Sequence, residues 1–315
     1  MADSRATALL DQMESVLYGK SEQIRLAFSA LLAGGHLLIE DVPGVGKTTL
    51  ALALARSIDL SFGRIQFTPD TLPGDITGYT TIDMRTGEMR FNVGPVMNNI
   101  VLADEINRTS PKTQASLLEV MEEGQITAEG KTLPLPTPFM VIATENPIEF
   151  TGTYDLPEAQ LDRFLMRISM GYPDTADEMK MLQSRIEGGG TAELQPVLSR
   201  EELLDMQRET RAVKVNEAIR DYIVRIVRAT RESLSLSLGA SPRASLALAR
   251  AAQAWAYLDG RTYVNPEDVQ AVAPAVLTHR LVVSLDASLR KATAADILAE
   301  RMQAVSVPPV FSAKR

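Results

Sequence analysis

The chain has 315 residues, of which 45% are hydrophobic and 23% are charged, and its formal net charge is −8. This composition is ordinary for a soluble globular protein, and the length suggests about two domains. The absence of cysteine excludes disulfides, thiol catalysis and cysteine metal sites. With two histidines and no H-E-x-x-H spacing, a zinc hydrolase has almost no support.

The N-terminal stretch carries acidic residues and no long apolar run, so we expect no signal peptide. No segment approaches the ~20 apolar residues that a membrane helix needs. We therefore expect a cytoplasmic protein with no membrane insertion. The acidic balance and the lack of an evident basic patch argue against a nucleic-acid partner.

In chain order, residues 21–34 have helical periodicity, with Ser21 as a plausible N-cap. The apolar run 36–40 predicts a buried strand, and a glycine-rich loop then leads into a predicted helix at 47–58. A phosphate-binding loop requires this strand–loop–helix context.

Three more strands are predicted at 64–68, 98–106 and 139–146. A helix is predicted from Pro111 to Gly124, because proline favours the first helical position and glycine the end. Strands that alternate with helices indicate a parallel sheet covered on both faces.

Two inserts interrupt this alternation. Residues 79–94 and 125–135 each have two extended halves, around Thr86–Gly87 and Glu129–Gly130, which predicts two hairpins. Strand signals stop after about residue 172, and helical segments follow from 199 onward. We place the first domain at 1–175 and a helical domain at 190–315, with the boundary near 172–190.

The stretch IEDVPGVGKTTLA departs from G-x-x-x-x-G-K-[ST] at its first glycine, where Asp41 stands. The backbone amides of Gly44 to Thr49 can still point at a phosphate at the start of a helix. Asp41 precedes those amides, so we expect its carboxylate to point away from the nucleotide. The residues predicted to hold the phosphates are Pro43, Gly44, Val45, Gly46, Lys47, Thr48 and Thr49. An ordinary glycine-rich turn is the alternative.

Polar side chains follow two of the predicted strands. The run IVLADEINR delivers Asp104 and Glu105 at the tip of an apolar strand. An Asp there can hold Mg²⁺, to which the Thr48 hydroxyl can also bind, and a following Glu can polarise the attacking water. Asn146 ends the next strand, where its amide could orient that water. The alternatives are an exposed acidic pair and an Asn-Pro turn.

Two arginines occupy defined places farther along the chain. Arg163 lies in LPEAQLDRF, and Arg243 follows Ser241 and Pro242, which are suited to the N-cap and the first turn of a helix. An arginine finger that reaches a neighbouring subunit's nucleotide is one interpretation of Arg163. The alternative for both is a solvated surface charge.

Taken together, PGVGKTT, VLADEINR, LLEVMEEG, ATENP, LPEAQLDRF and GASPRA resemble, in order, the MoxR family of AAA+ ATPases over roughly residues 15–280. The resemblance implies an α/β, three-layer αβα P-loop (AAA+) domain with a C-terminal all-α lid. It also implies a hexameric ring that uses ATP/ADP and Mg²⁺ and serves as a chaperone-like remodeller of protein clients, often with a von Willebrand factor A domain partner.

The same resemblance assigns roles to residues. Lys47 and Thr48 belong to Walker A, and Asp104 and Glu105 to Walker B. Asn146 is similar to sensor 1, Arg163 to the trans arginine finger and Arg243 to sensor 2. The resemblance implies that ATP binds in a cleft between the two domains, where Arg243 would report the γ-phosphate to the lid. Leu17, Tyr18 and Gly19 stand where the family packs against adenine, followed by Lys20 where many relatives carry Gln. The inserts resemble the hairpins that line the pore face.

Two other functions are compatible with these motifs. A nucleic-acid motor or loader of the same clade could use the hairpins to grip a strand, although the 79–94 insert has two Arg against one Asp and one Glu. A nucleotide-dependent scaffold would bind ATP and hydrolyse it poorly, which the intact set of Asp104, Glu105, Asn146 and two arginines disfavours. The client and the subunit number do not follow from the sequence.

Overall fold

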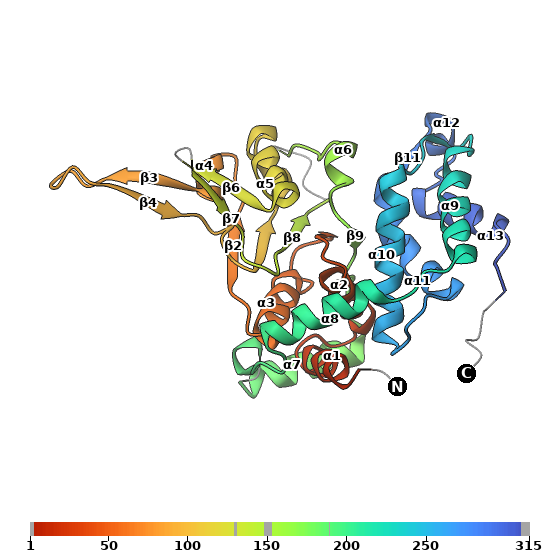
Figure 1. Ribbon diagram of the computed structural model, residues 1–315, viewed down its shortest axis with the longest axis horizontal. Helices are drawn as coiled ribbons and strands as arrows, with labels where there is room; N and C mark the ends of the chain where they lie inside the picture. The colour runs from red at the N-terminus through yellow and green to blue at the C-terminus, as the bar shows by residue number, and fades with distance from the viewer. Residues whose placement is uncertain (1–2, 129–130, 148–152, 189, 310–315) are drawn as a thin grey trace.

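The computed structural model describes residues 3–128, 131–147, 153–188 and 190–309. A parallel sheet with helices on both faces forms one part of the molecule, a long hairpin projects from it, and a group of helices packs on the opposite side (Figure 1). None of the helices in these ranges is both long and apolar enough to cross a bilayer.

The central sheet has five parallel strands in the order β2-β5-β8-β1-β9. Four match the predicted strands within a few residues, and the fifth was not predicted. Their bounds are β1 Leu37–Glu40, β2 Phe62–Gln66, β5 Ile100–Asp104, β8 Met140–Glu145 and β9 Met166–Ile168. The three residues of β9 are too few to give a periodic pattern.

Alternate strand residues pack on opposite faces of the sheet, which gives the three predicted layers. Leu37 and Ile39 lie in an apolar cluster with α1 Ser4–Glu14, α2 Ser21–Leu32 and α3 Lys47–Ser57. Leu38 lies in a second cluster with α4 Pro73–Thr77 and α5 Pro111–Glu123. The prediction of a sheet covered on both faces is confirmed.

Capping residues mark the start and the end of the helix that the sequence predicts from Pro111 to Gly124. Ser110 accepts a hydrogen bond from Thr113 N ahead of Pro111, and Gly124 ends α5 in the left-handed region at φ 65°. The predicted cap at Ser21 is wrong by one position, because Ser21 is already helical. Lys20 occupies the cap position without a side-chain hydrogen bond.

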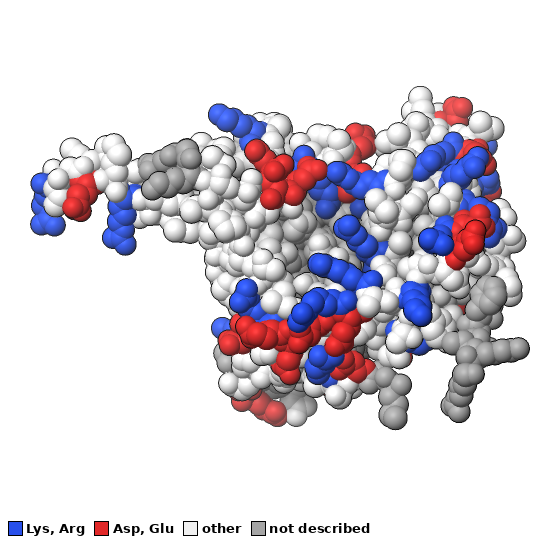
Figure 2. Space-filling model, in the orientation of Figure 1, with Lys and Arg blue, Asp and Glu red and all other residues white. Residues whose placement is uncertain are grey.

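Both inserts form antiparallel hairpins. The first pairs β3 Gly78–Ile82 with β4 Met89–Val93, and the second pairs β6 Gln125–Ala128 with β7 Lys131–Pro134. The predicted turn at Glu129–Gly130 lies outside the described residues. The β3–β4 hairpin projects far from the body and carries charges of both signs, two arginines against one aspartate and one glutamate (Figures 1 and 2). Met84 and Met89 near its tip are 93% and 72% exposed.

The C-terminal segment is helical, as predicted. Two helices precede it in the chain: α6 Glu158–Leu161, before β9, and α7 Thr175–Ile186, after β9. The C-terminal helices are α8 Arg200–Ala212, α9 Glu217–Arg231, α10 Pro242–Leu258, α11 Pro266–Leu277, α12 Leu285–Leu289 and α13 Ala294–Ala304. A two-stranded ribbon, β10 Leu236–Leu238 with β11 Val282–Val283, joins them and was not predicted. Short 3₁₀ turns occur at Ile106–Arg108, Thr191–Glu193 and Thr278–Arg280.

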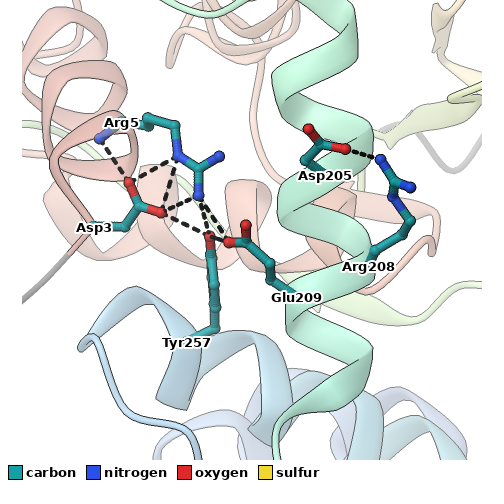
Figure 3. A network of polar contacts seen from close by, with 6 residues as sticks. All are labelled: Asp3, Arg5, Asp205, Arg208, Glu209 and Tyr257. Carbon is teal, nitrogen blue, oxygen red and sulfur yellow. Dashed lines mark hydrogen bonds and ion pairs between the residues drawn. The ribbon is translucent and has the colours of Figure 1, made fainter.

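A polar network ties the N-terminal helix to two C-terminal helices (Figure 3). The Tyr257 hydroxyl of α10 lies 2.5 Å from Glu209 Oε2 of α8 and 2.8 Å from Asp3 Oδ2, the N-cap residue of α1. It also accepts a hydrogen bond from Arg5 Nη2 at 3.1 Å. The Arg5 guanidinium holds the pKa of Asp3 at about 2. Three helices distant in sequence therefore meet at one hydroxyl.

We expect Tyr257→Phe to lower the free energy of unfolding by about 1–2 kcal/mol, because the two carboxylates and Arg5 lose a shared hydrogen-bonding partner. Urea denaturation of the variant and the wild type measures this difference. Tyr79→Phe, at an exposed tyrosine of the projecting hairpin, is the control. Because Asp3 has a depressed pKa, its contribution is full above the ordinary value near 3.8 and is lost as the pH falls through about 2. Equal unfolding midpoints for Tyr257→Phe and wild type would exclude this role.

Candidate functional site

The glycine-rich loop has the backbone conformation of an anion-binding turn. Gly44 and Gly46 have φ angles of 86° and 98°, which side chains with a Cβ rarely adopt. Space alone does not require glycine, since a Cβ at Gly44 would meet nothing within 4 Å. Gly46 caps the N-terminus of α3, where free amides and the helix dipole favour an anion.

Lys47, the first residue of α3, is 9% exposed, and its ammonium binds backbone carbonyls. Its Nζ donates to Asp41 O at 2.6 Å and to Glu145 O at 3.3 Å. Burial lowers the pKa of Lys47, and the nearby carboxylates of Asp104, Asp41 and Glu105 act in the opposite direction. The lysine is therefore a buried cation beside the loop, on acceptors that a phosphate oxygen can replace.

The Asp41 carboxylate is turned to the segment after β9, as its place before the loop amides predicts. Asp41 Oδ2 accepts hydrogen bonds from Ser169 Oγ at 2.8 Å and Gly171 N at 2.7 Å, and Oδ1 accepts from Val42 N at 2.7 Å. Burial alone would raise the pKa of Asp41, but these donors bring it below the ordinary value. Asp41, which stands where the motif has its first glycine, therefore has hydrogen-bond partners for both carboxylate oxygens.

A cavity of about 350 Å³ adjoins the loop, a size suited to a small ligand. Of the residues predicted to contact a nucleotide, Leu17, Tyr18, Gly44, Val45, Gly46 and Thr49 line it. The opposite wall was not predicted and comes from Tyr172, Pro173 and helix α7, including Asp177, Glu178 and Met181. Gly19 has a positive φ of 66°, and a Cβ there would lie 2.2 Å from Asp177 Oδ2.

The acidic pair stands at the end of β5, between β2 and β8 in the sheet, and polar side chains surround it. Asp104 is 9% exposed; its Oδ1 accepts from Thr144 Oγ1 at 2.7 Å and its Oδ2 pairs with Arg64 at 2.6 Å. Glu105 has a left-handed backbone (φ 58°), and its N–H donates to Thr144 Oγ1 at 2.8 Å. Strained non-glycine residues of this kind concentrate at functional sites.

The Glu105 carboxylate is held by two side chains that the sequence did not single out. Its Oε2 accepts from Gln66 Nε2 of β2 at 3.1 Å and from Arg108 Nη1 at 2.9 Å. Gln66 is the last residue of β2 and pairs with Asp104 in the sheet register. The sequence places it in the middle of the predicted strand at 64–68 and carries no signal for this role.

Asn146 lies at the end of β8 and is 4% exposed. It follows Glu145, whose backbone carbonyl accepts from Lys47. Burial, together with the neighbouring Glu40 carboxylate, raises the pKa of Glu145 to about 7. Asp104, Glu105 and Asn146 stand at the carboxyl ends of β5 and β8, and Lys47 Nζ reaches the same edge through Asp41 O and Glu145 O. Open α/β sheets bind ligands at this edge.

The two arginines lie elsewhere. Arg163 Nη2 pairs with Glu122 Oε2 at 2.9 Å, and Arg243 Nη2 pairs with Glu122 Oε1 at 3.0 Å. Both line a second cavity with Gly35 and His36, which precede β1. On the face drawn in Figure 2, basic side chains gather along the boundary between α5 and α10.

This second cavity is at the amino ends of the strands, since Leu165 N donates to His36 O at 2.9 Å just before β9 and β1 begin. The expectation that Arg243 reaches its own subunit's nucleotide from a cleft between the domains is therefore not met. The structure brings Arg243 to Arg163, at the opposite end of the strands from the phosphate loop. Glu122, which holds both arginines, was not predicted as a functional residue.

Comparisons with known proteins agree with this geometry. Residues 36–166 match the family described as "ATPase family associated with various cellular activities (AAA)", and residues 228–301 match "AAA lid domain". The chain is 49% identical to "Uncharacterized protein YeaC" of Bacillus subtilis, over 97% of this chain and 96% of that protein. It is 41% identical to "Chaperone MoxR1" of Mycobacterium tuberculosis, over 95% and 81%. A crystal structure of a proposed ATPase from Cytophaga hutchinsonii is 36% identical, with a TM-score of 0.91 over 97% of this chain and 95% of that chain.

Proposed function

The chain belongs to the MoxR family of AAA+ ATPases, and we propose that it binds and hydrolyses ATP in a ring of identical subunits to remodel protein clients. One observation carries the proposal: a buried lysine in a phosphate-loop backbone shares one edge of a parallel sheet with an Asp–Glu pair and a buried Asn. Those are the parts that phosphoryl transfer to water requires.

Each residue has a distinct part in this proposal. The loop from Pro43 to Thr49 holds the phosphates through its amides and Lys47, while Leu17, Tyr18 and Gly19 contact the base. Thr48 and Asp104 hold Mg²⁺, which neutralises phosphate charge when bound. Glu105 accepts the proton of the attacking water, and Asn146 orients that water. Lys47 binds the carbonyls of Asp41 and Glu145, and Glu105 accepts from Gln66 and Arg108. In this proposal, Lys47 and Glu105 exchange these partners for the phosphates and the attacking water when the nucleotide binds.

The two arginines act on the neighbouring subunit's nucleotide in this proposal. Their place at the amino ends of the strands, held together on Glu122, supports a role across a subunit contact and disfavours one within the subunit. A cation supplied across such a contact neutralises charge that develops on the transferred phosphoryl group. One carboxylate that holds both guanidinium groups keeps them on the same surface of the subunit.

A protein client suits the projecting hairpin better than a nucleic acid. Met84 and Met89 are exposed near its tip, with Ile82 beside them, and methionine is common at adaptable protein-binding surfaces. A strand of nucleic acid would require a basic surface, whereas the two arginines of the hairpin are balanced by one aspartate and one glutamate, and Figure 2 shows both signs of charge on it. The chaperone name of the mycobacterial relative agrees. A von Willebrand factor A domain partner and a cytoplasmic location belong to the same proposal.

The dependence of turnover on protein concentration tests assembly. If each active site needs arginines from a neighbour, the rate per subunit rises with concentration as rings form. We expect this rise in phosphate release with Mg²⁺-ATP, in step with the assembled fraction measured by sedimentation. A rate per subunit that stays constant over about a hundredfold range of concentrations, from mainly monomer to mainly ring, would refute the trans assignment. Stimulation by single-stranded DNA would instead favour the nucleic-acid motor.

A further inference from the structure

Two buried side chains of opposite charge hold the segment that connects β9 to α7. Asp41 and Lys20 are 8% and 6% exposed. Asp41 Oδ2 accepts from Ser169 Oγ and Gly171 N, while Lys20 Nζ donates to Gly171 O and Tyr172 O, both at 3.1 Å. Gly171 is therefore held through its N–H by one charge and through its carbonyl by the other.

The backbone of this segment requires such support. Gly171 has a φ of 62°, although a Cβ there would meet nothing within 4 Å, so glycine is needed for the conformation and not for space. A glycine with free surroundings is also the most mobile kind of residue. Charge-assisted hydrogen bonds are about twice as strong as neutral ones, and three of the four that fix this segment reach the backbone of residues 171 and 172.

Both charged residues lie next to segments of the proposed nucleotide site. Asp41 directly precedes the phosphate loop, and its own carbonyl accepts from Lys47 Nζ at 2.6 Å. Lys20 follows Leu17 and Tyr18 by two or three residues and lines one wall of the cavity with them. The held segment leads into the other wall, since Tyr172 lines the cavity and is followed by Asp177 and Glu178 of α7.

We propose that Asp41 and Lys20 are positioning residues that set the α7 wall against the phosphate loop, so that the site prefers a nucleoside triphosphate to a bare polyphosphate. The inference rests on the proposed ATP site and adds to it the source of nucleoside affinity. Within one subunit the loop supplies the phosphate contacts, whereas the contacts to base and ribose also need the α7 wall, which faces Leu17 and Tyr18 and is carried by Gly171 and Tyr172. In this proposal, Asp41 stands in place of the first glycine of the motif and connects the phosphate loop to the segment that carries the α7 wall.

Equilibrium binding of Mg²⁺-ATP and of inorganic tripolyphosphate, measured by calorimetry, separates this role from a direct effect on the phosphates. Asp41→Ala, Lys20→Met and Ser169→Ala are each expected to weaken ATP binding about tenfold and to leave tripolyphosphate binding within about twofold of wild type. Ser169→Ala removes one hydrogen bond to Asp41 without changing any charge. Asp41→Asn, which keeps an acceptor oxygen, is expected to fall between wild type and Asp41→Ala.

Glu14→Ala, at an exposed acid of α1, is the matched control and should bind both ligands as wild type does. Tighter binding of both ligands by Asp41→Ala would show that Asp41 acts by repelling phosphate, and equal weakening of both would show a general structural role. Unchanged ATP affinity in Asp41→Ala and Ser169→Ala would also overturn the proposal. A wild-type protein that binds tripolyphosphate and not ATP would refute the proposed function itself.

Discussion

An Arg163→Ala variant is expected to hydrolyse ATP roughly 10³- to 10⁵-fold more slowly than wild type, the range for removal of an arginine that stabilises a phosphoryl-transfer transition state. Its affinity for nucleotide should be unchanged, because Arg163 lies at the amino ends of the strands, away from the phosphate loop of its own subunit. Steady-state turnover and nucleotide binding of the same preparation measure both quantities. Arg228→Ala, at an exposed arginine that also pairs with a glutamate, is the control.

Mixing variants sharpens this test. A Lys47→Ala subunit lacks the loop cation but keeps Arg163, and an Arg163→Ala subunit keeps its loop. In a mixed ring, an Arg163→Ala subunit that adjoins a Lys47→Ala subunit has a complete site. We expect the mixture to exceed the summed rates of its two inactive components after exchange of subunits. No gain in assembled mixtures would place the arginine's action within its own subunit or exclude it from catalysis.

Glu105→Gln is expected to lower turnover about 10²- to 10⁴-fold, the contribution of a general base, while ATP binding persists. Gln has the same length and can keep the hydrogen bond to Arg108 as an acceptor, so the left-handed backbone at this position is retained. Single-turnover hydrolysis together with nucleotide binding measures the two effects. Glu201→Gln, at a largely exposed acid on α8, should leave both unchanged.

The same variant can identify the client. A ring that binds ATP without hydrolysing it stays in the ATP-bound state, so proteins held by the hairpins should be retained in a pull-down with Glu105→Gln and ATP, and released with ADP. If Glu105→Gln hydrolysed ATP at the wild-type rate, Glu105 would not be the general base. The variant would then not stay in the ATP-bound state and could not retain the client.

The elements that carry the carboxyl-edge site were predictable because each is local in sequence. The loop and α3 form one continuous motif, and Asp104, Glu105 and Asn146 directly follow apolar strands whose ends must share one edge of a parallel sheet. Glycine and proline mark the ends of α5 and the start of α10. These signals depend on residues within a few positions of each other.

What could not be predicted depends on contacts between distant segments. Arg243 meets Glu122 because α10 packs beside the end of α5, and no periodicity in either helix specifies that pairing. The partners of Asp41 lie about 130 residues away, at Ser169 and Gly171. Strand β9 has three residues and no pattern of its own; it exists because the edge of β1 supplies hydrogen bonds.

A parallel sheet has two unlike ends, and in the proposed assembly each end carries half of the nucleotide site. Two subunits related by a two-fold axis would present identical surfaces to each other and leave both halves incomplete. The contact must therefore be head-to-tail, and such a contact either closes on itself or continues as an open filament. The rotation between successive subunits then decides which occurs. A substitution at the α5–α10 boundary can thus convert a closed ring into a filament while every residue of both half-sites remains in place.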